Sequence, residues 1–248
     1  MYNYVCVTYL DANSNVYFRV IGNSIGLALH TGNAVVLHFT MQGDILKDPD
    51  IRTLKATQLK FVTIWNMGFQ MIFLFLSLLC DVQLILKKKN VPKYVKHIRA
   101  YNDIIFSAIV WPLTVIVFTV FWPFFIINRE LIFPAFIDKA ISLTSNHIMH
   151  TSILPIVLIE MFCHPRSRPK SHKWYLAHAV FIFVSYFAVI LYNYSNTGTF
   201  PYPFVLMLYG TVYFPLFVLA TSIIYLILYF TQWTINDLVH KRNKSKIR

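Results

Sequence analysis

The stretch FVTIWNMGFQMIFLFLSLLCDVQLIL, residues 61–86, decides the fold class of this chain. Its 26 residues contain one charged side chain, Asp81, which stands near the end of the run. An α-helix rises about 1.5 Å per residue, so about 20 apolar residues cross the hydrocarbon core of a bilayer. The stretch is therefore predicted to be a transmembrane helix.

The composition of the whole chain has the same character. Of its 248 residues, 57% are hydrophobic and 13% are charged, and the mean hydropathy is +0.56. Soluble domains carry about 25% charged residues. The net charge is +12, but the Lys and Arg residues form short clusters between apolar runs, as they do in the loops of membrane proteins. This layout indicates a polytopic membrane protein and argues against nucleic-acid binding.

Five apolar runs are near or above the length of a membrane span, and a weaker sixth run precedes them. The weaker run carries Arg19 and His30, so we expect it to be buried in protein rather than exposed to lipid. The chain is predicted to be all-α, a bundle of six transmembrane helices that forms one membrane domain over residues 1–248. The predicted spans are 16–41, 61–86, 101–127, 142–162, 174–192 and 203–230, followed by a basic tail at 231–248.

The basic residues also predict the orientation of the bundle. With six spans, sixteen of the 22 Lys and Arg residues lie on the side that holds both ends of the chain, and six lie on the other side. Positive charge is enriched in cytoplasmic loops, which places both termini in the cytoplasm. Asp81 and Asp103 stand beside the most basic loop, so we expect them at the membrane interface.

Two histidines, His147 and His150, begin the fourth predicted span. Their spacing of three residues puts both on one face of a helix. An ionisable group within a span is a candidate functional residue, although a neutral ring bonded to a neighbouring helix is an equally good interpretation. Two histidines alone do not make a metal site, which needs one or two more ligands, and the three cysteines are scattered. We therefore predict no metal and no cofactor.

A buried histidine that acts as a general base needs a nucleophile within hydrogen-bond reach. Thr63 stands at the start of the second predicted span, level with the two histidines. Most threonines in membrane helices simply donate to a backbone carbonyl one turn earlier. From this pattern alone, the role of Thr63 stays open.

Residues 121–160 carry several motifs that point to a known family. The sequence over about residues 55–230 resembles the androgen-induced gene family, whereas the N-terminal segment and the basic tail do not match it. The combination NHxxHT with LPxxLIE is the most specific part of the match. The matching residues are Lys60-Phe61-x-Thr63, Arg129-Glu130, Pro134, Asn146-His147, His150-Thr151, Leu154-Pro155, Ile159-Glu160 and Tyr202-Pro203-Phe204.

The resemblance implies a polytopic hydrolase that cleaves fatty acid esters of hydroxy fatty acids, with one threonine and one histidine essential. By motif, these two residues are Thr63 as the nucleophile and His150 as the base, with His147 as a companion of His150. The lipid substrate would enter sideways from the bilayer. Lys60 or Arg129 would meet its free carboxylate near the interface.

Several parts of this assignment stay open. Asn146 and Asn66 are candidate donors to the oxyanion, and the residue that orients His150 is unassigned. The alternative function is a non-enzymatic membrane protein, either a small transporter or a lipid-binding or regulatory scaffold. The location is the plasma membrane or the endoplasmic reticulum and its related membranes, and the protein partners are unknown. The candidates to orient His150 are Glu130, Asp138 and Glu160.

Overall fold

The computed structural model describes residues 15–87 and 91–244, and within these ranges the chain forms ten α-helices and no strand. Cys6, Lys88, Lys89 and the last four residues of the predicted tail lie outside them. Short 3₁₀ helices occupy Gly43–Lys47, Gln58–Lys60, Arg129–Leu131 and Ala135–Lys139. The α-helices are α1 (Val16–Thr40), α2 (Pro49–Thr57), α3 (Val62–Lys87), α4 (Lys93–Ile105), α5 (Trp111–Asn128), α6 (Leu143–His150), α7 (Ile153–Cys163), α8 (Lys173–Thr197), α9 (Pro203–Leu208) and α10 (Tyr213–Lys244).

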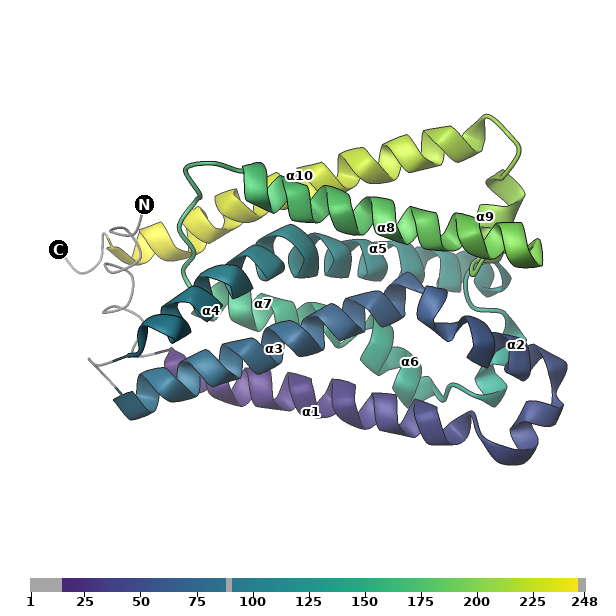
Figure 1. The fold of residues 1–248 in the computed structure, drawn as a ribbon, viewed down its shortest axis with the longest axis horizontal. Helices are drawn as coiled ribbons and strands as arrows, with labels where there is room; N and C mark the ends of the chain where they lie inside the picture. Colours follow the sequence, from purple (N-terminus) through teal and green to yellow (C-terminus); the bar gives the residue numbers. More distant parts are fainter. Residues whose placement is uncertain (1–14, 88–90, 245–248) are drawn as a thin grey trace.

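The described residues contain six helical segments that are long and apolar enough to cross a membrane, which confirms the predicted fold class. The segments run along the long axis of the molecule, and α2 and α9 lie at one end, which we call the α2 end (Figure 1). α4 and α5 together form the third segment, and α6 and α7 form the fourth. The six segments are Val16–Thr40, Val62–Leu86, Lys93–Leu131, Leu143–Cys163, Lys173–Thr197 and Tyr213–His240.

The third span is longer than predicted, because it begins at Lys93 instead of residue 101. It contains a single π-helical turn, Phe106–Val110, directly before Trp111-Pro112. Proline has no N–H and its ring crowds the carbonyl four residues earlier, so the carbonyl of Ala108 is left without a helical partner. The hydroxyl of Tyr225 on α10 donates to that carbonyl at 2.6 Å. The carbonyl that the proline frees is thus a hydrogen-bond acceptor through which Tyr225 holds α10 against the third span.

The fourth span, predicted as one helix over 142–162, is broken between α6 and α7. The break lies at Thr151-Ser152, where Pro155 crowds the carbonyl of Thr151 four residues earlier. His150 becomes the last residue of α6, and its own carbonyl accepts a hydrogen bond from the indole N–H of Trp122 at 3.3 Å.

The last span also differs from the prediction, which placed it at 203–230. Residues Pro203–Leu208 form the separate short helix α9, and α10 begins at Tyr213. Gly210 lies between them with φ of +79°, a left-handed conformation that costs glycine little and ends the short helix. α10 then continues to Lys244, because Gln232, Trp233 and Asn236 are buried against the bundle. Much of the predicted tail is therefore helix.

Helix α1 packs closely on α7 through two glycines one turn apart. A Cβ added at Gly22 would lie 2.9 Å from Ile159 Cγ2, and one at Gly26 would lie 3.1 Å from Ile156 Cγ2. Small residues spaced by four allow two membrane helices to approach this closely. The weak first span is thus held in the bundle by close packing.

A buried ion cluster ties the same helix to α3 and α4 at the end opposite to α2. Asp81 is fully buried among the helices. Its carboxylate accepts hydrogen bonds from Arg19 at 2.7 Å and from Arg99. Asp103 is less buried and pairs with Arg166 at 3.3 Å.

We expect Asp81→Ala to destabilise the protein strongly, because it leaves two arginines without their shared carboxylate. Breaking a buried ion pair costs about 3–5 kcal/mol. Thermal denaturation in detergent measures the effect, with Asp44→Ala as the control, since Asp44 pairs with Lys47 on the exposed surface. Equal melting temperatures for the two variants would contradict the importance of the cluster.

Candidate functional site

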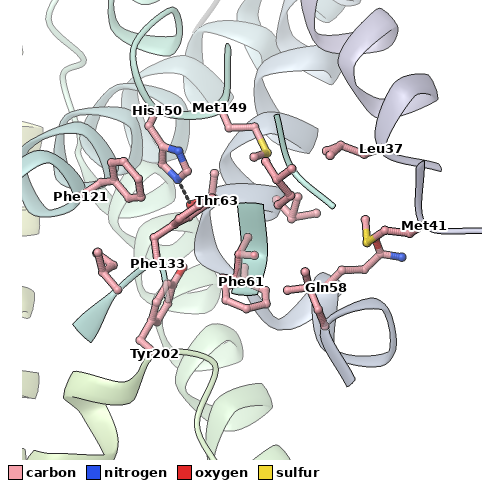
Figure 2. Close-up of a pocket in the computed structure, with 15 residues that line it drawn as sticks. Leu37, Met41, Gln58, Phe61, Thr63, Phe121, Phe133, Met149, His150 and Tyr202 are labelled. Carbon is pink, nitrogen blue, oxygen red and sulfur yellow. Dashed lines mark hydrogen bonds between the residues drawn. The ribbon is translucent and has the colours of Figure 1, made fainter. Parts of the chain in front are cut away.

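Thr63 lies in the first turn of α3 at the α2 end, and it is buried. The carbonyl to which a helical threonine would ordinarily donate, that of Leu59, accepts a hydrogen bond from the indole N–H of Trp65 at 2.8 Å instead. The Thr63 hydroxyl lies 3.1 Å from Nε2 of His150 (Figure 2). The structure thus brings together the two residues that the resemblance assigned to catalysis.

His150 is held by three contacts. Its Nδ1 lies 2.7 Å from Oδ1 of Asn146 and 3.1 Å from the Asn146 backbone carbonyl. Both of these atoms are acceptors, so Nδ1 carries the proton and, in the neutral ring, Nε2 presents its lone pair to Thr63. The ring also stacks on Phe121, with the two centroids 3.5 Å apart. The histidine therefore has the tautomer and the orientation that a general base needs.

Asn146 is thus the residue that orients His150, because its side-chain oxygen accepts a hydrogen bond from Nδ1 of the ring. The two residues are four apart on α6, a spacing at which side chains meet on a helix. The spacing is visible in the sequence, and an amide oxygen can accept from a ring N–H as a carboxylate does. The arrangement Thr63, His150, Asn146 has the connectivity of a hydrolase triad whose third member is an amide.

The acidic candidates for this role all bind elsewhere. Glu130 accepts a hydrogen bond from the backbone N–H of Ala135 at 3.0 Å. Asp138 pairs with Arg129 at 2.9 Å. Glu160 accepts from Arg166 at 2.8 Å at the opposite end of the bundle.

His147 lies one turn from His150 but outside the site. Its side chain is exposed, its Nδ1 lies 2.9 Å from the Thr151 hydroxyl, and its ring stacks on Trp122 at a centroid distance of 5.3 Å. The indole of Trp122 also donates to the carbonyl of His150, so Trp122 contacts both histidines. The two histidines are therefore neighbours along the helix rather than partners.

The two basic residues expected near a substrate carboxylate are both engaged. Lys60 donates to Oδ1 of Asn193 at 2.5 Å. Arg129 pairs with Asp138 and lies over the rings of Phe125 and Phe133. In the described part of the chain, neither Lys60 nor Arg129 is among the residues that line the cavities beside Thr63.

Asn66, the other candidate donor to an oxyanion, belongs to a buried chain of polar side chains across the bundle. Its Oδ1 accepts from Thr114 at 2.9 Å, Thr114 accepts from Gln70 at 2.7 Å, and Gln70 contacts His30 at 2.8 Å. The Nδ2 group of Asn66 is buried and has no partner in the described structure. His30 on the first span is thus part of this network.

Two apolar cavities meet at Thr63. The first lies on the side of His150 and extends to α1 and α2. The second extends between α5, α8 and α10. The residues that line both cavities are Thr63, Phe121, Ile132 and Tyr202.

Comparison with known proteins gives the family of the chain. The sequence model of the FAR-17a/AIG1-like protein family matches residues 26–237. The androgen-dependent TFPI-regulating protein of Homo sapiens is 36% identical over 191 residues, which cover 75% of this chain and 81% of that protein. The protein of the same name from Mesocricetus auratus is 36% identical over 144 residues, which cover 58% of this chain and 61% of that protein.

The androgen-induced gene 1 protein of Homo sapiens is more distant. It is 28% identical over 149 residues, which cover 58% of this chain and 62% of that protein. No solved structure matches the chain significantly. Because the family model matches most of the chain, this protein belongs to the FAR-17a/AIG1-like family.

Proposed function

We propose that this protein is an intramembrane threonine hydrolase that cleaves fatty acid esters of hydroxy fatty acids. The observation that carries the proposal is the 3.1 Å contact between the Thr63 hydroxyl and Nε2 of His150 at the junction of two apolar cavities. The substrate class comes from the family resemblance of the NHxxHT and LPxxLIE motifs.

The residues of the site suffice for a two-step acyl transfer. His150 takes the proton of the Thr63 hydroxyl as its oxygen attacks the ester carbonyl, because a threonine hydroxyl is a weak nucleophile until a base activates it. His150 then returns the proton to the leaving alkoxide, which departs as the hydroxy fatty acid. Water, activated by the same imidazole, releases the fatty acid from Thr63. Asn146 holds the imidazole in one tautomer throughout.

The layout of the two cavities suits an ester with two arms. Each cavity would accept one arm, and the scissile carbonyl would lie beside Thr63, which lines both. α8 and α10, which line the second cavity, are the least buried of the six spans, so a lipid would enter between them from the bilayer. With both termini in the cytoplasm, as the basic loops predict, the α2 end faces the other side of the membrane.

The proposal is tested with the wild-type protein reconstituted in liposomes. We expect release of free hydroxy fatty acid from a branched fatty acid ester of a hydroxy fatty acid, and covalent labelling by a fluorophosphonate probe. If well-folded protein shows no turnover and no labelling, the hydrolase is refuted, and the transporter or scaffold is favoured.

We expect Thr221→Trp to reduce the length of the acyl arm that the site accepts. Thr221 lines the second cavity from α10. It stands eight residues after Tyr213, the first residue of that helix, and so about 12 Å along the helix. An indole there would block the deep part of the cavity. The ratio of kcat/KM for an ester with a palmitoyl arm to that for a butanoyl arm is expected to fall roughly tenfold, since lost apolar contacts cost about 1–3 kcal/mol.

The matched control is Leu219→Trp, because Leu219 lies on the same helix and is exposed. This control should leave the ratio unchanged. If Thr221→Trp reduces turnover of both esters equally, the second cavity does not hold a substrate arm.

A further inference from the structure

Tyr202 lies immediately before α9, and its phenol ring points back into the bundle. The residue is extended, with φ of −117° and ψ of 123°, as expected before Pro203. Its ring packs edge-on against Phe61 at a centroid distance of 5.3 Å. These contacts bring the hydroxyl to the first turn of α3, beside Thr63.

The Tyr202 hydroxyl is oriented by the backbone of α3. The N–H of Val62 donates to it at 3.1 Å, and the backbone N–H of Thr63 and the hydroxyls of Thr63 and Tyr186 also lie within reach of it. The first N–H groups of a helix have no acceptor within the helix, so they help to fix such a hydroxyl. Because a backbone N–H can only donate, the phenol oxygen accepts from these groups, and its own proton can be donated to an oxygen beside Thr63.

That proton stays on the phenol at physiological pH. Burial is the main cause that raises the pKa of Tyr202, to about 12. The hydroxyl is therefore a neutral donor over the whole range in which an imidazole can act as a base.

The position of Tyr202 relative to the catalytic pair is suited to the ester carbonyl. Figure 2 shows Tyr202 and His150 approaching Thr63 from opposite sides. Of the four residues that line both cavities, Tyr202 is the only one besides Thr63 with a polar side chain. An ester carbonyl at the Thr63 oxygen, with one arm in each cavity, would therefore have this phenol as a polar neighbour.

We propose that the Tyr202 hydroxyl donates a hydrogen bond to the carbonyl oxygen of the scissile ester as that oxygen becomes an oxyanion. This inference rests on the proposed function. The bond from Thr63 Oγ1 to the carbonyl carbon forms while His150 takes the proton, and the carbonyl electron pair moves to the oxygen. Tyr202 stabilises that charge and keeps its own proton. On collapse the carbonyl re-forms, and the alkoxide leaves with the proton from His150.

The test is Tyr202→Phe, which removes the donor and keeps the ring. We expect kcat for the hydroxy fatty acid ester to fall about 100-fold with little change in KM, as for the loss of one donor to an oxyanion. Tyr209→Phe is the matched control, because Tyr209 directly follows α9 and does not line either cavity among the described residues. It should retain wild-type turnover and the same melting temperature.

A second measurement separates a donor from a merely structural ring. A trifluoromethyl ketone with a long alkyl chain adds to the Thr63 oxygen and forms a stable oxyanion, whereas the product fatty acid binds without one. Tyr202→Phe should weaken inhibition by the ketone about 100-fold and leave inhibition by the fatty acid unchanged. If inhibition by the ketone is unchanged, or both inhibitors weaken equally, the inference is overturned. If wild type hydrolyses the ester in a Thr63-dependent way and Tyr202→Phe is fully active, only this inference fails, while an inactive wild type refutes the proposed function itself.

Discussion

Thr63→Ala is expected to reduce ester hydrolysis by about 10⁴-fold or more, to the level of membranes without the protein. The substitution removes the nucleophile, and the remaining binding groups of a hydrolase contribute far less than its reacting groups. His150→Ala should have a similar effect, because Nε2 of His150 lies 3.1 Å from the Thr63 hydroxyl and accepts its proton in the proposed mechanism. Covalent labelling by a fluorophosphonate should be lost in both variants at equal expression.

Two other substitutions make this result specific. Thr119→Ala removes an exposed hydroxyl on α5 that donates to the backbone carbonyls of Val115 and Ile116 on its own helix, and it should leave turnover unchanged. Thr63→Ser keeps the hydroxyl and should retain both labelling and part of the turnover. Labelling that persists in Thr63→Ala would show that another residue is the nucleophile.

Asn146→Leu should lower kcat by about 10²- to 10³-fold, which is the second largest expected effect. The amide oxygen of Asn146 accepts from Nδ1 of His150 at 2.7 Å, and without it the imidazole loses the partner that fixes its tautomer. The loss should be smaller than for His150→Ala, because the backbone carbonyl of residue 146 also accepts from Nδ1, at 3.1 Å.

A conservative variant, Asn146→Asp, distinguishes a role in orienting His150 from a merely structural role of Asn146. Asn146→Asp keeps an acceptor at the same position and should restore most of the rate of fluorophosphonate labelling that Asn146→Leu loses. Ser145→Ala, a substitution at the neighbouring buried position, serves as the control and should label like wild type. If the Asp and Leu variants are equally slow, Asn146 does not act by accepting a hydrogen bond from His150.

The sequence was sufficient to predict the membrane spans, because their signal is local. The length and apolar composition of residues 61–86 are enough to predict a membrane span, whatever the helix packs against. The helix breaks were harder to predict. Pro112 and Pro155 were visible, but whether a proline kinks, widens or interrupts a helix depends on which partner satisfies the freed carbonyl. In this protein Tyr225 satisfies one of them from a helix more than a hundred residues away.

The site was predicted only in part for the same reason. Thr63 and His150 were identified through a family resemblance, and their separation of 87 residues shows why no local pattern could pair them. Tyr202 matched a family motif but received no role, since its hydroxyl meets Val62 across 140 residues of sequence. Lys60 and Arg129 were chosen for their charge, but their partners Asn193 and Asp138 were not foreseeable from composition.

The ion pair between Arg19 and Asp81 has a consequence for how the chain is inserted into the membrane during synthesis. α1 is made before α3, yet its hydropathy is 1.3 against 2.1 for α3. α1 also carries Arg19 in its first turn, a charge that lowers the tendency of a segment to leave the translocon for the lipid. The carboxylate that balances Arg19 is synthesised 62 residues later. α1 is therefore expected to stay beside the translocon until α3 emerges and supplies Asp81, so the two helices enter the lipid as a pair.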